Sequence, residues 1–174
     1  MVEIVPATGK PLECDSEGFF NWDNDSFEDG LLDETVKLLS FSRQDLLRLI
    51  DGVSDDVLDA RLTQGKRTIR EIVDHIAIAE WWYTTRLAAD PSRARPWSEY
   101  GADVLSRLNE IRNMFLHEFV PMLRRMSDRE RQQVFEHRGE RWTAKKVLRR
   151  AVWHELLHLK QLYRLVPKVV SAVW

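Results

Sequence analysis

Apolar residues recur every three or four positions in several long stretches of this chain, which is the spacing of one face of an α-helix. No comparable stretch alternates apolar and polar residues as a strand would, and only residues 133–136 suit a brief extended piece. Four long amphipathic helices are therefore predicted. They cover about residues 31–50, 68–89, 104–126 and 143–167, with a short helical turn at 54–58.

Capping residues and prolines indicate where these helices begin, break and end. Thr68 followed by Glu71 has the pattern of a capping box, and Thr143 is a good N-cap for the last helix. Pro121 predicts a kink in the third helix, because proline has no N–H to donate. Pro167 is predicted to end the fourth helix.

Residues 1–30 lack helical periodicity and are strongly acidic. They contain eight Asp and Glu residues against Lys10 alone, and they include the aromatic cluster Phe19-Phe20-Asn21-Trp22. We interpret them as an extended arm or linker whose aromatic side chains dock on the body. The chain is thus divided into an acidic arm, residues 1–30, and one helical domain, residues 31–174, which is long enough for a sizeable core.

Charge and cysteine content narrow the setting in which the protein works. The chain has a formal net charge of −2, and the part after the arm carries +5, spread along helices in basic pairs that suit solvated faces. Nucleic-acid binding is therefore not expected. One cysteine, Cys14, excludes an internal disulfide and fits a reducing compartment. Without a signal-peptide pattern or a membrane-length apolar run, a cytoplasmic location is expected.

The candidate chemistry lies in the fourth helix. His154 and His158 are four residues apart, so their imidazoles project from one face and suit a shared metal ion. His-Glu-Leu-Leu-His also matches the zinc-protease pattern, which usually takes a third ligand from further along the chain. No His, Asp, Glu or Cys follows His158. A third ligand must come from upstream, and His75, on the apolar side of the second helix, is predicted to point inward.

Three inward-facing histidines are the kind of set from which helix bundles build metal centres. Such a set leaves positions open for water or a substrate, and neutral imidazole suits zinc, nickel, iron, cobalt or copper. Three core histidines without a metal are the alternative. Glu155 is a candidate general base or an acceptor that orients a ligand histidine. An outward ion pair is its third interpretation, and a structural or orienting role is favoured.

Other residues near this face have simpler interpretations. Gln161, one turn beyond His158, either lines the site or hydrogen-bonds across the bundle. Glu80 is expected to make a buried polar contact, whereas Trp82 and Trp153 are expected in the core. Two further histidines lie off the apolar faces and are not preferred ligands: His117 and His137.

Three segments together resemble the DinB-like superfamily: Thr68-Ile-Arg-Glu-Ile-Val-Asp-His75-Ile-Ala-Ile-Ala-Glu-Trp-Trp-Tyr, Trp142-Thr-Ala-Lys-Lys-Val-Leu and His154-Glu-Leu-Leu-His158-Leu-Lys-Gln161. The resemblance covers nearly the whole helical domain. It implies an all-α, up-up-down-down-type four-helix bundle, often a homodimer. It also implies a divalent metal, zinc or nickel foremost, held by one histidine of the second helix and two of the last. Those positions correspond to His75, His154 and His158.

The resemblance implies a function as well. Relatives with a known activity use bacillithiol or mycothiol, low-molecular-weight thiols, as co-substrates, and the metal there favours the reactive thiolate. The resulting hypothesis is a metal-dependent thiol S-transferase acting on a small electrophile, with Glu155 or a water handling the proton. Two alternatives stay open. One is a metal-dependent hydrolase with metal-bound hydroxide as nucleophile and Glu155 as base; the other is a non-catalytic stress-response binding protein.

Overall fold

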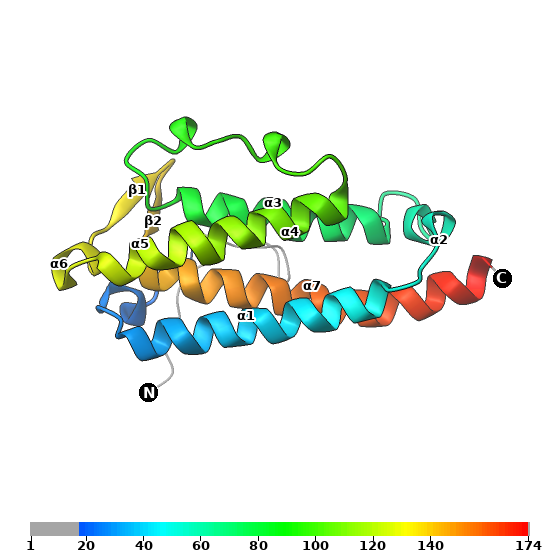
Figure 1. Ribbon diagram of the computed structural model, residues 1–174, viewed down its shortest axis with the longest axis horizontal. Coiled ribbons are helices and arrows are strands. Elements are labelled where there is room, and N and C mark those ends of the chain that lie inside the picture. The colour runs from blue at the N-terminus through cyan, green and yellow to red at the C-terminus, as the bar shows by residue number, and fades with distance from the viewer. Residues whose placement is uncertain (1–17, 174) are drawn as a thin grey trace.

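The computed structural model describes residues 18–173, and these residues form a bundle of four long helices (Figure 1). The predicted all-α four-helix bundle is confirmed. The bundle consists of α1, Asp29–Ile50; α3, Ile69–Thr85; a third helix that begins as α4, Val104–Met114, passes through a π-helical turn, Phe115–Phe119, and ends as α5, Val120–Arg125; and α7, Ala144–Val173.

Two of these helices run in each direction. α1 and α7 run one way and α3 and α4 the other, so the order along the chain is up, down, down, up (Figure 1). This order differs from the up-up-down-down order that the resemblance implied. Residues 86–103 connect α3 to α4 by returning along the length of the bundle. Because of this crossing loop, α3 and α4 are consecutive in the chain and run in the same direction. α7 packs against both α1 and α3, and α3 packs against α4.

Apolar side chains fill the bundle in two clusters. One includes Leu46, Ile76 and Leu162, and the other, further toward the start of α7, includes Leu39 and Phe115. Some of the buried polar side chains, such as Arg43 and Glu155, lie between residues of the two clusters along their helices. No helix in the described part of the chain is both long enough and apolar enough to cross a membrane.

Short elements occupy the connections. α2, Asp55–Asp59, is the predicted helical turn, and α6, Asp128–Arg131, follows α5. β1, Phe135–His137, and β2, Glu140–Trp142, pair as an antiparallel hairpin. Arg138 and Gly139 join them with positive φ angles of 55° and 83°, the conformation that a two-residue hairpin turn requires. The sequence analysis had anticipated only one extended piece here.

The predicted helix starts are confirmed at both caps. Thr68 and Glu71 form the capping box of α3, and the Thr143 hydroxyl accepts from the N–H of Lys146 at 3.2 Å at the start of α7. Pro121 directly follows the start of α5, so the departure from regular α geometry, the π-helical turn, lies immediately before it.

The last helix does not end at Pro167, contrary to the prediction. α7 continues to Val173 although a proline inside a helix costs about 3 kcal/mol. Val166 and Val169 are buried in the core, whereas Pro167 is exposed. Burying two such side chains stabilises by about 1.5–3 kcal/mol each, which offsets the lost hydrogen bond.

α3 also departs from its predicted length, because it ends at Thr85 rather than near residue 89. The hydroxyls of Thr84 and Thr85 donate to the carbonyls of Trp81 and Trp82, each at 2.7 Å. Hydroxyls that bond to nearby backbone in this way compete with the helical ladder.

The described end of the acidic arm docks on the start of α7, and its aromatic residues make the predicted contacts. The guanidinium of Arg149 lies 4.6 Å from the Phe20 ring centre, and the Lys145 ammonium lies 4.0 Å from that of Trp22, both in cation–π arrangements. The fully buried carboxylate of Asp23 accepts from Arg149 at 2.9 and 2.7 Å. The rest of the predicted arm, residues 1–17, lies outside the described residues.

Candidate metal centre

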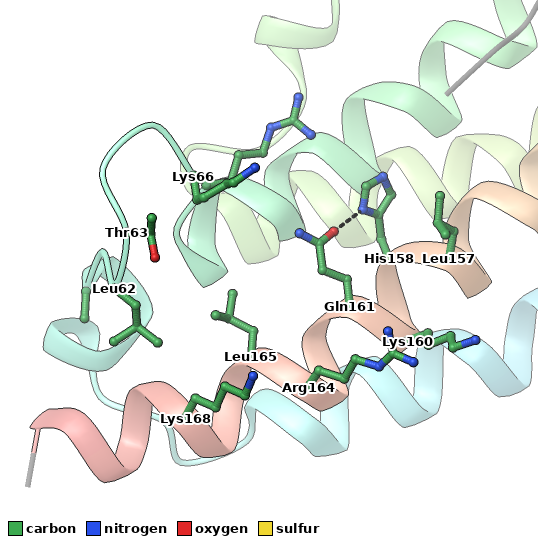
Figure 2. Close-up of a pocket in the computed structure, with 12 residues that line it drawn as sticks. Leu62, Thr63, Lys66, Leu157, His158, Lys160, Gln161, Arg164, Leu165 and Lys168 are labelled. Atoms are coloured by element: carbon green, nitrogen blue, oxygen red, sulfur yellow. Dashed lines mark hydrogen bonds between the residues drawn. The ribbon is translucent and has the colours of Figure 1, made fainter. Parts of the chain in front are cut away.

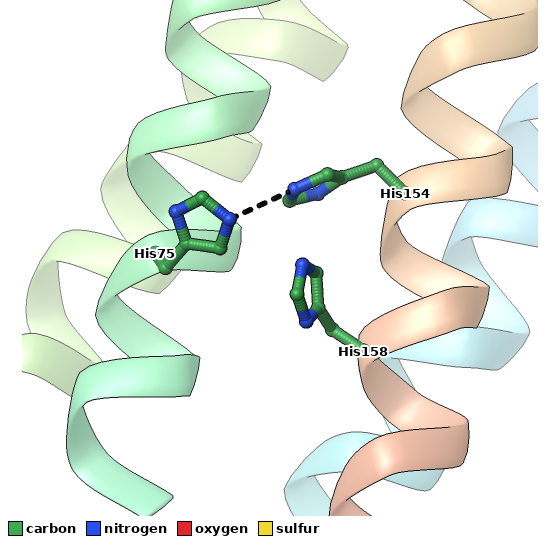
Figure 3. A group of neighbouring side chains, drawn as sticks. All are labelled: His75, His154 and His158. Carbon is green, nitrogen blue, oxygen red and sulfur yellow. Dashed lines mark hydrogen bonds between the residues drawn. The ribbon is translucent and has the colours of Figure 1, made fainter. Parts of the chain in front are cut away.

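Three imidazoles point toward one another between α3 and α7 (Figure 3). Nε2 of His75 and Nε2 of His154 are 3.1 Å apart, and the ring centres of His154 and His158 are 4.4 Å apart. One ring nitrogen from each residue lies within 4.8 Å of the other two. The predicted convergence of the three histidines is confirmed, and we call this group the histidine cluster.

Helix geometry explains why these side chains meet. His154 and His158 are one turn apart on α7, on the face that also carries the buried Ala151 and Leu162. His75 lies on α3 beside the buried Ile76. Because α3 packs against α7, the apolar faces that the sequence predicted bring the three histidines to one place.

Gln161 fixes the orientation of one ring. Its side-chain oxygen Oε1 accepts from Nδ1 of His158 at 2.9 Å. In a neutral imidazole that donates from Nδ1, the lone pair lies on Nε2, the nitrogen available to a ligand. Gln161 therefore lines the site, which is the first of its two predicted roles.

Burial keeps the three imidazoles neutral. Desolvation, aided by the neighbouring histidines, lowers the pKa of His154 to about 2. Desolvation, aided by the positive charge of Arg67, lowers the pKa of His75 to about 4. The pKa of His158 is also lowered, mainly by burial, although its hydrogen bond to Gln161 opposes the shift. Neutral imidazole is the form that binds metal ions.

The donor set fits a divalent transition metal. Two nitrogens 3.1 Å apart can both contact one ion, because a metal–nitrogen bond measures about 2.0–2.1 Å. Within residues 18–173 no Asp, Glu or Cys belongs to the cluster, so the donors are three neutral nitrogens. Such a set suits zinc, nickel, copper or iron, and three ligands leave room for water or a substrate.

Glu155 follows His154 in the sequence but belongs to a different buried group. Its Oε1 accepts from the Ser42 hydroxyl at 3.0 Å and from Nε of Arg43 at 3.3 Å, and its Oε2 accepts from Arg43 and Arg112. The side chain is buried, so the outward ion pair is wrong. These contacts agree with a structural role. They also occupy both carboxylate oxygens, which leaves the predicted general-base role without a contact to the histidine cluster.

Two arginines and two glutamates complete this second group. Glu80 accepts from Nη2 of Arg43 at 2.9 Å and from Nε of Arg112 at 2.6 Å, so its predicted buried polar contact is confirmed. Burial acts to lower the pKa of Arg43, but Glu80 and Glu155 outweigh it and raise the pKa. We call Arg43, Glu80, Arg112 and Glu155 the four-charge cluster. Each residue comes from a different long helix.

The sequence analysis missed the two arginines. In an amphipathic pattern a single arginine suits the solvated face, and only its register places it inside. Arg43 is four residues after Leu39, and Arg112 follows Ile111, both of which are buried. That register was the available signal, because a charge on an apolar face requires a buried partner.

The remaining candidates have separate outcomes. His117 is exposed, as predicted, and Nε2 of His137 lies 3.0 Å from the carbonyl oxygen of Arg86. Trp82 is half-buried. Trp153 is wrong as a core residue, because it is 38% exposed. Trp153 directly precedes the inward-facing His154 on α7, and one residue along a helix is a rotation of about 100°. Its side chain therefore points away from the face that carries the histidine.

Comparisons with known proteins agree with this fold. The family model of the DinB superfamily matches residues 38–162, which include all three histidines of the cluster. One similar solved structure is described as "YfiT from Bacillus subtilis is a probable metal-dependent hydrolase with an unusual four-helix bundle topology". It aligns with a TM-score of 0.60 and 21% identity, over 82% of this chain and 90% of that chain, which shows a shared fold. A search of curated protein sequences found no match. Because the family model spans more than half of the chain, this protein belongs to the DinB superfamily.

Proposed function

We propose that this protein is a divalent-metal enzyme that transfers a low-molecular-weight thiol to a small electrophile. The observation that carries the proposal is the histidine cluster, in which His75, His154 and His158 present neutral nitrogens to one point. These three residues would hold the ion. When bound, the metal lowers the pKa of a thiol that reaches it and so supplies the reactive thiolate at neutral pH.

The chain's own residues provide orientation and space. Gln161 holds the His158 ring, and a pocket of about 680 Å³ opens beside that histidine, within the usual size of small-molecule sites. In the transfer, the thiol proton leaves to solvent and the sulfur bonds to the electrophilic carbon. The leaving group departs with the electron pair of the bond that breaks. This chemistry needs no protein base, which agrees with the engagement of Glu155 by two arginines.

Metal-dependent hydrolysis is the second candidate, favoured by the fold shared with YfiT, which is described as a probable metal-dependent hydrolase. A hydrolase uses water as its nucleophile. Free water has a pKa of about 15.7 against about 8.5 for a thiol, so even on a metal the water gains more from a protein group that takes its proton. Glu155, the residue predicted for this task, is held by Ser42, Arg43 and Arg112 instead. We therefore place hydrolysis after thiol transfer.

Metal content and thiol dependence test the proposal together. Protein purified without a histidine tag should contain close to one zinc, nickel or similar ion per chain by elemental mass spectrometry. The triple variant His75→Ala, His154→Ala, His158→Ala should lose it, and His117→Ala, an exposed histidine outside the cluster, should keep it. Conjugation of a thiol to a chromogenic electrophile such as 1-chloro-2,4-dinitrobenzene should then depend on the metal.

Other results of these measurements would support one of the alternative functions. Metal-dependent ester cleavage without any thiol would favour the hydrolase. A stoichiometric ion with neither activity, unperturbed by thiols, would favour a non-catalytic binding protein. Failure to bind zinc or nickel even after incubation would contradict the whole proposal. The homodimer implied by the family stays a prediction, which light scattering on the purified protein measures.

A further inference from the structure

A pocket beside the histidine cluster is lined by positively charged side chains (Figure 2). It has a volume of about 680 Å³ and lies between the loop that joins α2 to α3 and the C-terminal half of α7, with His158 in its wall. None of the described residues that line it is acidic. Five cations do line it: Lys66 and Arg67 from the loop, and Lys160, Arg164 and Lys168 from α7.

The three α7 cations follow one another at intervals of four residues, so they form a row on one face of the helix. Like charges at this spacing destabilise a helix slightly. Within residues 18–173, none of the five cations forms an ion pair with a carboxylate, whereas arginines elsewhere, such as Arg61 and Arg70, do. The row therefore has a cost in the described structure and no internal counterion there.

The pocket is also coupled to the histidine cluster. His158 and Gln161, which are hydrogen-bonded to each other, both belong to its wall. The charge of Arg67 acts on all three imidazoles. Leu157 and Leu165 contribute an apolar part of the lining. A ligand seated among the cations would thus extend toward the nitrogens of the cluster.

We propose that this pocket binds the anionic part, carboxylate or phosphate, of the small molecule whose reactive group reaches the histidine cluster. The inference rests on the proposed function and adds that the preferred thiol carries negative charge. A small ligand is favoured over a nucleic acid because the pocket is concave and partly apolar and has His158 in its wall. A nucleic-acid strand is served by a groove that tracks its backbone past several phosphates.

Isothermal titration of full-length, zinc-loaded protein with matched ligands tests the assignment. 2-Mercaptosuccinate, 2-mercaptoethanol and cysteamine are thiols with negative, no and positive additional charge, and succinate is the anion without a thiol. The pocket variant is Lys160→Gln with Arg164→Gln. The control is Lys37→Gln with Arg48→Gln, which removes the same charge from exposed positions on α1. Circular dichroism checks that both variants are folded.

Mercaptosuccinate should bind about tenfold or more tightly than mercaptoethanol, with cysteamine weakest, because one charged contact is worth about that factor. The advantage should fall about tenfold in the pocket variant, persist in the control and shrink between 0.15 and 0.5 M salt, where charges are more strongly screened. Equal affinities for mercaptosuccinate and mercaptoethanol, or equal losses in both variants, would overturn the assignment.

The ligand set separates this inference from the proposed function. Binding of all three thiols with the same affinity leaves the thiol function standing and removes the anion pocket. If succinate binds but none of the thiols binds more tightly than succinate, the anion pocket is supported and the thiol function is contradicted. If a 12-nucleotide single strand binds more tightly than mercaptosuccinate and loses its affinity in the pocket variant, the small-ligand assignment is wrong.

Discussion

Replacing Glu155 with glutamine tests the four-charge cluster most directly. The substitution nearly conserves volume but removes one negative charge, so Arg43 and Arg112 are left with Glu80 as their only charged partner in the cluster. All four side chains are buried. Removing one partner of a buried ion pair costs about 3–5 kcal/mol, because the charge that remains has lost its compensation and has no access to water.

The contacts place the expected loss within this range. Glu155 accepts from the Ser42 hydroxyl at 3.0 Å, from Arg43 at 3.3 and 3.2 Å, and from Arg112. A glutamine would keep one oxygen as an acceptor and turn its NH₂ group toward donors. Against a typical total stability of about 5–15 kcal/mol, the variant should unfold at clearly lower urea. At about 2–4 °C per kcal/mol for a chain of this length, Tm should fall by about 6–20 °C.

Urea unfolding followed by circular dichroism and tryptophan fluorescence measures this loss. Asp45→Asn, which breaks the exposed pair with Arg48, is the control and should cost less than about 1 kcal/mol. The double variant Glu155→Gln, Arg112→Met should lose less than the sum of the two single variants, because it restores the charge balance. A loss below about 1 kcal/mol for Glu155→Gln, or strict additivity, would refute the reasoning.

Three further predictions concern other parts of the chain. Metal-free protein should lose stability as pH falls below about 6.5. The cause is that histidines of the unfolded chain bind protons there, whereas His75 and His154, with pKa values lowered to about 4 and about 2, do not. Urea titrations from pH 7.5 to 4.5 should show a shallower loss for the triple His→Gln variant, and parallel profiles would contradict this. Pro167→Ala should raise stability by about 1–2 kcal/mol in thermal unfolding, since it restores a helical N–H, and a lowered Tm would show that the proline is favourable. Asp23→Asn should cost about 2 kcal/mol and expose the arm to limited proteolysis, because it breaks the paired contact with Arg149, and unchanged cleavage would argue against tight docking.

The helical pattern was sufficient to predict four helices and an inward position for each of the three histidines of the cluster. Two histidines at a spacing of four share a face by helix geometry alone, and the missing downstream ligand directed attention to His75. Local pattern was weaker where tertiary packing decides the outcome. The burial of Val166 and Val169 stabilises the last helix beyond Pro167. The residues around the proline do not reveal this, because the burial depends on packing against other helices.

The ion pairs between helices could not be predicted from the sequence either. The pattern predicted a buried polar contact for Glu80 and left both inward and outward positions open for Glu155, but it did not show which cations would contact them. Arg43 and Arg112 are 37 and 32 residues from Glu80 along the chain. Such partners follow from the relative register of two helices, which amphipathic spacing leaves undefined by whole turns.

The four-charge cluster lies between the two apolar clusters, at the level where Glu155 follows His154. A slide of one helix by a turn, about 5.4 Å, would keep apolar faces in contact but would separate these charges. We therefore expect the cluster to fix the register that places His75 opposite His154. Glu80→Gln should then weaken zinc binding by about tenfold in competition with a chelator, although Glu80 is outside the histidine cluster. Glu118→Gln, an exposed change on the third helix, should leave zinc affinity unchanged. If a folded Glu80→Gln protein binds zinc as tightly as the wild type, the two clusters are energetically independent.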